Sequence, residues 1–159
     1  MQRVLGIIAL IGFMLSLAAH IAAVCGVAVA EHIPFIWLLH LGVFAVFIPL
    51  VFAMKNTMGN RPSFKQIRAA FPAWVIVVGI CLFVYVAVNF LLAMGGMEGE
   101  PGLADNGKYV LSQRGKLIRE ISPAEFTRFK ANQIRAFSGH WLLFYFMPFA
   151  YFMFYRKPK

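Results

Sequence analysis

The sequence predicts an all-α integral membrane protein, a four-transmembrane-helix bundle with a small extracytoplasmic β-hairpin and helix inserted between the third and fourth spans. Of its 159 residues, 61% are hydrophobic and only 13% are charged, whereas soluble domains carry roughly 25% charged residues. Four apolar runs contain no Asp, Glu, Lys or Arg: residues 4–30, 33–54, 70–95 and 137–155. A helix needs roughly 20 such residues to cross a bilayer. The whole chain, 1–159, is therefore expected to form a single membrane domain, and a soluble enzyme is excluded.

The first two spans are separated by only two residues, Glu31 and His32. Such a short link predicts a tight antiparallel pair of helices. A cleaved signal peptide is the alternative for residues 4–30, because Arg3 precedes this run. The apolar core of a signal peptide is about 7–15 residues long, so the longer run favours a membrane span.

The second link, residues 55–69, is basic and contains a helix-start signal. Ser63 and Gln66 have the spacing of a capping box, which predicts a short helix lying at the membrane surface. Four basic side chains of this link are expected to contact lipid headgroups: Lys55, Arg61, Lys65 and Arg68. A solvated basic loop fits the same residues equally well.

The third link, residues 96–136, is the largest polar segment. Around its start lie Gly95, Gly96, Gly99, Pro101 and Gly102, which predict a flexible exit from the third span. Two β-prone runs, 108–112 and 116–121, flank a turn with Gly115 and predict a β-hairpin. Ser122 and Glu125 then give a second helix-start signal. The amphipathic helix that follows is expected either to lie along the bilayer surface or to run directly into the fourth span.

Lysine and arginine gather on the cytoplasmic side of membrane proteins. Here they occur without acidic residues at Arg3, in residues 55–69 and at the end of the chain, at Arg156, Lys157 and Lys159. Both termini are therefore expected in the cytoplasm of a multi-pass protein of the plasma membrane, the inner membrane of a bacterium. Because the basic residues flank spans and form no separate domain, the expected partners are membrane lipids and another integral membrane protein, with no nucleic acid.

Motifs for catalysis are missing from the sequence. It contains no Gly-x-Ser-x-Gly elbow, phosphate-binding loop or His-Glu-x-x-His zinc helix. Ser138 and His140 are two residues apart, and such positions do not face each other on a helix. The preferred function is consequently non-catalytic: an accessory or assembly factor that binds a membrane protein or a lipid through its outer face.

Polar side chains gather in the outer half of the predicted spans. Histidines are found at His20, His40 and His140, and other polar groups at Ser16, Tyr85 and Asn89. If these groups face one another, they form a polar pocket that opens to the outside. Alternatively, each one forms a hydrogen bond between neighbouring helices and binds no ligand.

Arg135 followed by His140 and Trp141, with further histidines on other spans, is similar to the four-helix membrane cytochromes b. The similarity covers the start of one helix. In that family, facing pairs of histidines at matched depth hold haem, whereas the three histidines here lie at different depths. The resemblance implies an alternative function, a redox protein that binds haem b or a metal through His20, His40 and His140.

Overall fold

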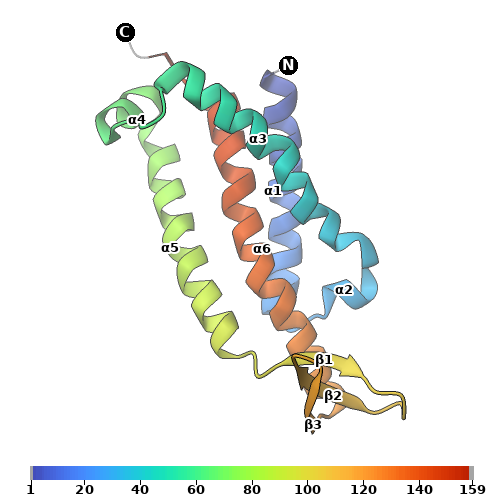
Figure 1. Cartoon of the computed structure of the whole chain (residues 1–159). Helices are drawn as coiled ribbons and strands as arrows, with labels where there is room; N and C mark the ends of the chain where they lie inside the picture. The colour runs from blue at the N-terminus through green and yellow to red at the C-terminus, as the bar shows by residue number, and fades with distance from the viewer. Residues whose placement is uncertain (1, 158–159) are drawn as a thin grey trace.

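The computed structural model describes residues 2–157, most of which are helical (Figure 1). Three stretches are long and apolar enough to cross a membrane: Gln2–Val24, Pro34–Met58 and Ala73–Gly95. They correspond to the first three predicted spans. The fourth predicted span, residues 137–155, falls in the second half of a helix whose first half is polar, and it is not one of the three. The structure therefore supports a membrane protein with three candidate spans and does not confirm the four-helix bundle.

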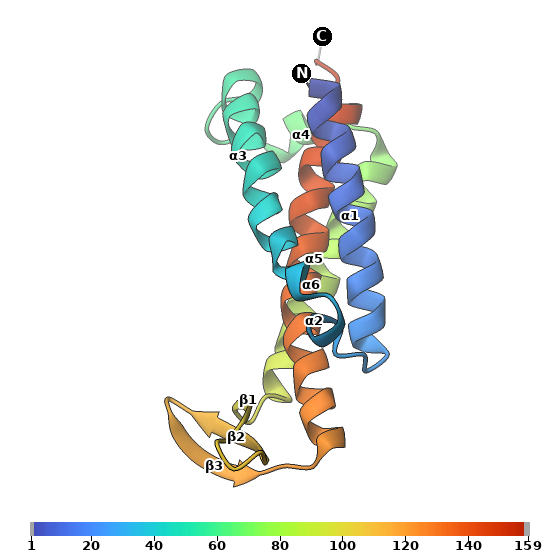
Figure 2. The same ribbon diagram turned by 90° about the vertical axis from the view of Figure 1, so that its right-hand side faces the viewer.

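The elements follow one another as α1 (Gln2–Val24), α2 (Val29–His32), the 3-10 helix η1 (Pro34–Trp37), α3 (Leu38–Met58), α4 (Phe64–Ala70), α5 (Ala73–Gly95), β1 (Glu100–Leu103), β2 (Tyr109–Gln113), β3 (Lys116–Glu120) and α6 (Pro123–Phe154). Figures 1 and 2 show α6 in the middle of the long helices. The sheet lies at one end of the molecule. Helix α4, the start of α1 and the end of α6 lie at the other end.

Helix α6 is the element on which the others pack, because it contacts α1, α3, α5 and the sheet. Aromatic side chains fill these contacts: Trp141 is 1% exposed and Tyr145 is 3% exposed. Small residues of α1 face them, and a Cβ on Gly6 would lie 2.7 Å from the sulfur of Met153. Glycines on α1 thus allow the two helix backbones to approach closely.

The first helix ends earlier than the apolar run predicts. Helix α1 stops at Val24, and Gly26 follows with a φ of 86°. The N–H of Gly26 bonds to the carbonyl of Ala23 and the N–H of Val27 to that of Ala22, which is the Schellman pattern that ends helices at glycine. The link between the first two spans is therefore longer than Glu31 and His32, since it includes this turn, α2 and η1.

The polar segment forms a three-stranded antiparallel sheet in the order β1-β2-β3. Strands β2 and β3 are the predicted hairpin, and positive φ values at Arg114 (52°) and Gly115 (77°) are those of a two-residue hairpin turn. Strand β1 corrects the prediction of a flexible exit, because Pro101 pairs with Leu111 at the sheet edge. Its signal was weak because Gly and Pro are poor strand formers.

Both predicted helix starts form with complete capping boxes. In α4, Ser63 and Gln66 bond each other's backbone N–H groups, and in α6 Ser122 and Glu125 do the same. The amphipathic helix continues without a break into the apolar residues from Phe137 onward. One rigid helix therefore joins the sheet to the centre of the bundle.

Candidate functional site

A buried histidine joins three helices near the sheet end of the bundle. His20 on α1 is 3% exposed. Its Nδ1 lies 2.8 Å from the hydroxyl of Ser138 on α6, and its Nε2 lies 2.6 Å from the hydroxyl of Tyr85 on α5. Both ring nitrogens of His20 are thus engaged by side chains. The ring packs edge-on against Tyr85 with a centroid distance of 5.6 Å, so its orientation is also held by packing.

Asn89 and Arg135 continue this polar contact between α5 and α6. The Nε of Arg135 donates to Oδ1 of Asn89 over 2.8 Å, and Nδ2 of Asn89 donates to the carbonyl of Arg135 over 3.1 Å. Gly139 makes room for the amide, because a Cβ there would lie 2.8 Å from Nδ2 of Asn89. We call His20, Tyr85, Asn89, Arg135 and Ser138 the buried network after its three buried members, His20, Asn89 and Ser138; Tyr85 is 44% exposed.

Ser16 lies one turn from His20 on α1 and is fully buried. Its hydroxyl has no hydrogen-bond partner among the described residues, and it does not bond to the buried network. Among the predicted pocket residues, the structure therefore joins Tyr85 and Asn89 to the network and leaves Ser16 outside it.

A polar cleft of about 430 Å³ lies at the mouth of the buried network. The ends of α1 and α5 form its apolar walls, and the first half of α6 contributes Arg128, Asn132 and Arg135. These three residues share one face of α6 because their spacing is four and then three residues. Asn132 also donates to the carbonyl of Ala93 over 2.8 Å. Glu98, which pairs with Arg119, also lines the cleft, so the cleft is a polar surface with charges of both signs at the junction of bundle and sheet.

The other two predicted histidines line a different cavity, which His20 does not reach. His40 on α3 and His140 on α6 both line a space of about 610 Å³ between α3, α5 and α6. Nδ1 of His40 accepts a hydrogen bond of 3.0 Å from the indole N–H of Trp141. Nδ1 of His140 lies 2.9 Å from the carbonyl of Ala136. We call this space the histidine cavity.

The three predicted histidines do not form one ligand set. No group of three or more His, Cys, Asp or Glu side chains within residues 2–157 is arranged to hold a metal ion. A pair of haem ligands needs one unprotonated ring nitrogen on each histidine. Since Nδ1 of His40 accepts from Trp141, the neutral ring carries its proton on Nε2. The residues present therefore do not fit a haem between His40 and His140.

The predicted headgroup contacts gather at the end opposite the sheet. Lys55 lies in the last turn of α3, Arg61 in the loop, and Lys65 and Arg68 on α4, and all four are exposed. Arg156 and Lys157 follow α6 at the same end (Figure 1). Lys159, also counted on this side, lies outside the described residues. The basic residues of distant segments are thus brought to one end of the molecule.

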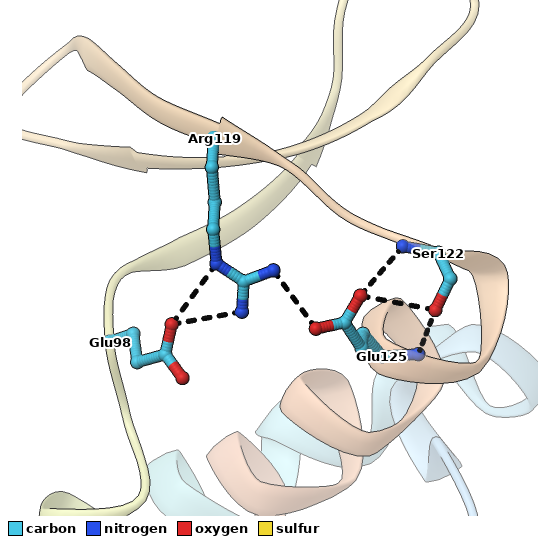
Figure 3. Close-up of polar contacts among 4 residues, drawn as sticks. All are labelled: Glu98, Arg119, Ser122 and Glu125. Carbon is cyan, nitrogen blue, oxygen red and sulfur yellow. Dashed lines mark hydrogen bonds and ion pairs between the residues drawn. The ribbon is translucent and has the colours of Figure 1, made fainter.

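Ion pairs fix the sheet to the start of α6 (Figure 3). Arg119 on β3 donates from Nη2 to Glu98 over 2.9 Å and from Nη1 to Glu125 over 2.9 Å. The backbone N–H of Ser122 and then Arg119 lower the pKa of Glu125 to about 2. Leu111, Ile121 and Phe129 form a small core beneath these contacts. We call the sheet with the first turns of α6 the cap.

Sequence reasoning missed several partners of the predicted site residues. Arg135 and Ser138 belong to the buried network, and the indole N–H of Trp141 donates a hydrogen bond to His40. The spacing of Arg128, Asn132 and Arg135 was a usable signal, since it places three polar side chains on one helix face. No comparable signal tells which neighbouring helix each side chain meets.

Comparison of the chain with protein-family models, with curated proteins and with solved structures gave no match.

Proposed function

We propose that the chain is a four-span protein of the bacterial plasma membrane, with both termini in the cytoplasm. It acts as a non-catalytic accessory or assembly factor that binds another integral membrane protein through the cap. The observation that carries the proposal is the construction of the cap, a rigid polar unit with an exposed strand edge.

The second half of α6 supports a fourth span because it runs antiparallel along α1. Gly6 of α1 lies beside Met153, and His20 lies beside Ser138. Residues 138–153 of α6 therefore occupy the same depth as residues 6–20 of α1. Helix α6 is less apolar because it is central: Trp141, Tyr145 and other side chains contact protein where the outer helices would contact lipid.

The charge distribution supports the orientation. Lys55, Lys65, Arg68 and Arg156 share the end that carries both ends of the chain, as expected of a cytoplasmic side. A reporter that is active only outside the cytoplasm should be silent when fused after Lys159 and active when inserted near Asn106. The opposite pattern of reporter activity would refute the orientation.

The cap supports binding of a protein partner. Arg119 bonds to both Glu98 and Glu125, and α6 runs unbroken from the cap into the bundle, so the cap is held in one position. Its outermost strand, β3, nevertheless exposes Leu117 and Ile118, with exposed fractions of 66% and 45%. A strand with an unpaired edge can add a strand from another chain.

Photo-crosslinking in native membranes tests this function. A benzophenone side chain introduced at Leu117 should give one dominant adduct that contains another membrane protein. The matched control position is Asn106, which is also exposed but lies in the turn between β1 and β2. Equal adducts at both positions, or none at Leu117, would refute partner binding through β3.

A further inference from the structure

We propose that the histidine cavity binds the head group of a lipid-soluble hydroquinone, with His40 donating a hydrogen bond to it and His140 accepting one from it. The hydrocarbon tail of this ligand occupies an apolar groove that adjoins the cavity along α6. This inference does not depend on partner binding by the cap.

The hydrogen bonds of the two histidines assign opposite roles to them. An indole N–H only donates, so Nδ1 of His40 accepts from Trp141 and the neutral ring carries its proton on Nε2. A carbonyl only accepts, so Nδ1 of His140 donates to Ala136 and Nε2 keeps its lone pair. Of the residues that line the cavity, His40 therefore carries a donor at Nε2–H and His140 an acceptor at Nε2.

The remaining walls of the cavity suit a flat, uncharged ring. They are aromatic or apolar and include Phe44, Phe90, Phe137 and Phe144. The ring of Phe90 meets that of His140 edge-on at 4.9 Å. None of the described residues that line the cavity is charged, so a carboxylate or phosphate ligand would bring an unpaired charge into an apolar site.

A second apolar space continues the cavity toward α4. This groove of about 410 Å³ is lined by α3, α4, α5 and α6, and it includes Gly79, Phe83 and Leu143. Phe144 of the cavity and Met147 of the groove are three residues apart on α6 and therefore share one face of that helix, which places the two spaces in succession along α6. In Figure 1, α3 crosses in front of α6 and diverges from α5 toward the end of the molecule that carries the sheet. A lipid-soluble molecule can thus lie along α6 with its head between the histidines.

The paired roles favour the hydroquinone over the quinone. A hydroquinone hydroxyl can donate to His140 while an oxygen of the same ring accepts from His40, which satisfies both groups. A quinone has only acceptor oxygens, so it bonds to His40 and leaves the acceptor nitrogen of the part-buried His140 without a partner. The hydroquinone therefore makes one hydrogen bond more than the quinone and should bind more tightly.

Binding of decylubiquinol and decylubiquinone to the full-length protein in phosphatidylcholine nanodiscs tests the proposal, measured by calorimetry under anaerobic conditions with empty nanodiscs subtracted. The hydroquinone should bind about tenfold more tightly than the quinone, the effect of one hydrogen bond. His140→Phe should remove this preference by weakening hydroquinone binding alone, and His40→Phe should weaken both forms. His32→Phe is the control, because His32 lies outside the cavity and bonds to the carbonyl of Ala28.

A separate variant tests the tail groove without touching either histidine. A Cβ on Gly79 would lie 3.6 Å from Phe146, in ordinary contact, so a larger side chain there fills the groove. Gly79→Leu should weaken decylubiquinol at least several-fold and leave the tail-less 2,3-dimethoxy-5-methylhydroquinone unchanged. Equal affinities of the two redox forms for the unmodified protein, the same loss in His32→Phe as in His140→Phe, or a haem absorption band in the purified protein would overturn the proposal.

Discussion

At the residue scale, the structure depends on where small residues meet large ones. The ring of Tyr145 occupies the space beside Gly12 of α1, and its hydroxyl donates to the carbonyl of Leu39 over 2.7 Å. One aromatic side chain thus connects α6 with α1 and α3. Gly79 on α5, unlike Gly12, has room for a side chain, because a Cβ there would make only an ordinary contact with Phe146.

Gly12→Ala should therefore destabilise the protein, whereas Gly79→Ala should not. A Cβ at position 12 overlaps the Tyr145 ring, and such overpacking costs about 1–3 kcal/mol. At position 79 alanine is the better helix former by roughly 1 kcal/mol. Unfolding by SDS titration, measured by circular dichroism, compares the two variants. A Gly12→Ala protein as stable as Gly79→Ala would contradict the contact with Tyr145.

The buried network provides a second comparison at this scale. Asn89→Leu removes the acceptor for Nε of Arg135 in a part-buried contact and leaves that charged donor without this partner, which should cost about 1–3 kcal/mol. Tyr85→Phe removes a hydroxyl from a half-exposed ring and should cost less, near the roughly 0.6 kcal/mol average for hydrogen bonds between membrane helices. The same SDS titration measures both free energies of unfolding, and equal losses would argue against a special role for Arg135.

At the scale of elements, the ends of several helices and strands are set by contacts between residues that are close together in the sequence. The capping boxes at Ser63 and Ser122 and the turn at Arg114-Gly115 involve residues within three positions of one another. They were predictable for that reason. The Schellman turn at Gly26 is equally local, but a single glycine within an apolar run gave a weaker signal than the run itself.

Acid should loosen the cap through Glu125. Its carboxylate has a pKa lowered to about 2 from the ordinary 4.5, so it is more strongly ionised in the folded cap than in an unfolded one. The resulting stabilisation is complete above pH 4.5 and is lost as the pH falls toward 2. Hydrogen exchange of β1 to β3, corrected for intrinsic rates, should rise over that window. Glu125→Gln should exchange faster at neutral pH and lose this pH dependence; an unchanged profile would contradict it.

At the scale of the whole molecule, the arrangement depends on α6 as the central helix. Its contacts with α1 and α3 join residues more than 100 positions apart, such as His20 with Ser138 and Leu39 with Tyr145, and it also contacts α5. The antiparallel pairing with α1 is also what supports a fourth span.

Disulfide trapping tests this pairing in the membrane. With Cys25 and Cys81 replaced by serine, cysteines at Gly6 and Met153 should form a disulfide rapidly under mild oxidation, because the two positions are in contact. Cysteines at Gly6 and Ser138 occupy the same helices at opposite ends and should remain reduced. Non-reducing gels report the result, and equal oxidation of both pairs would exclude the antiparallel register.

The sequence by itself predicted four membrane spans, of which the structure supports three as candidates, and it determined the helix starts and the hairpin, because each depends on composition or on neighbours in the chain. Only the tertiary structure decided that His20 joins a buried network while His40 and His140 line a separate cavity. It also decided that β1 completes the sheet and that α6 lies at the centre. The physical reason is that a helix apolar on every side has no face marked as interior. Packing between distant segments then sets which helix each polar side chain contacts, and a local pattern of residues does not predict it.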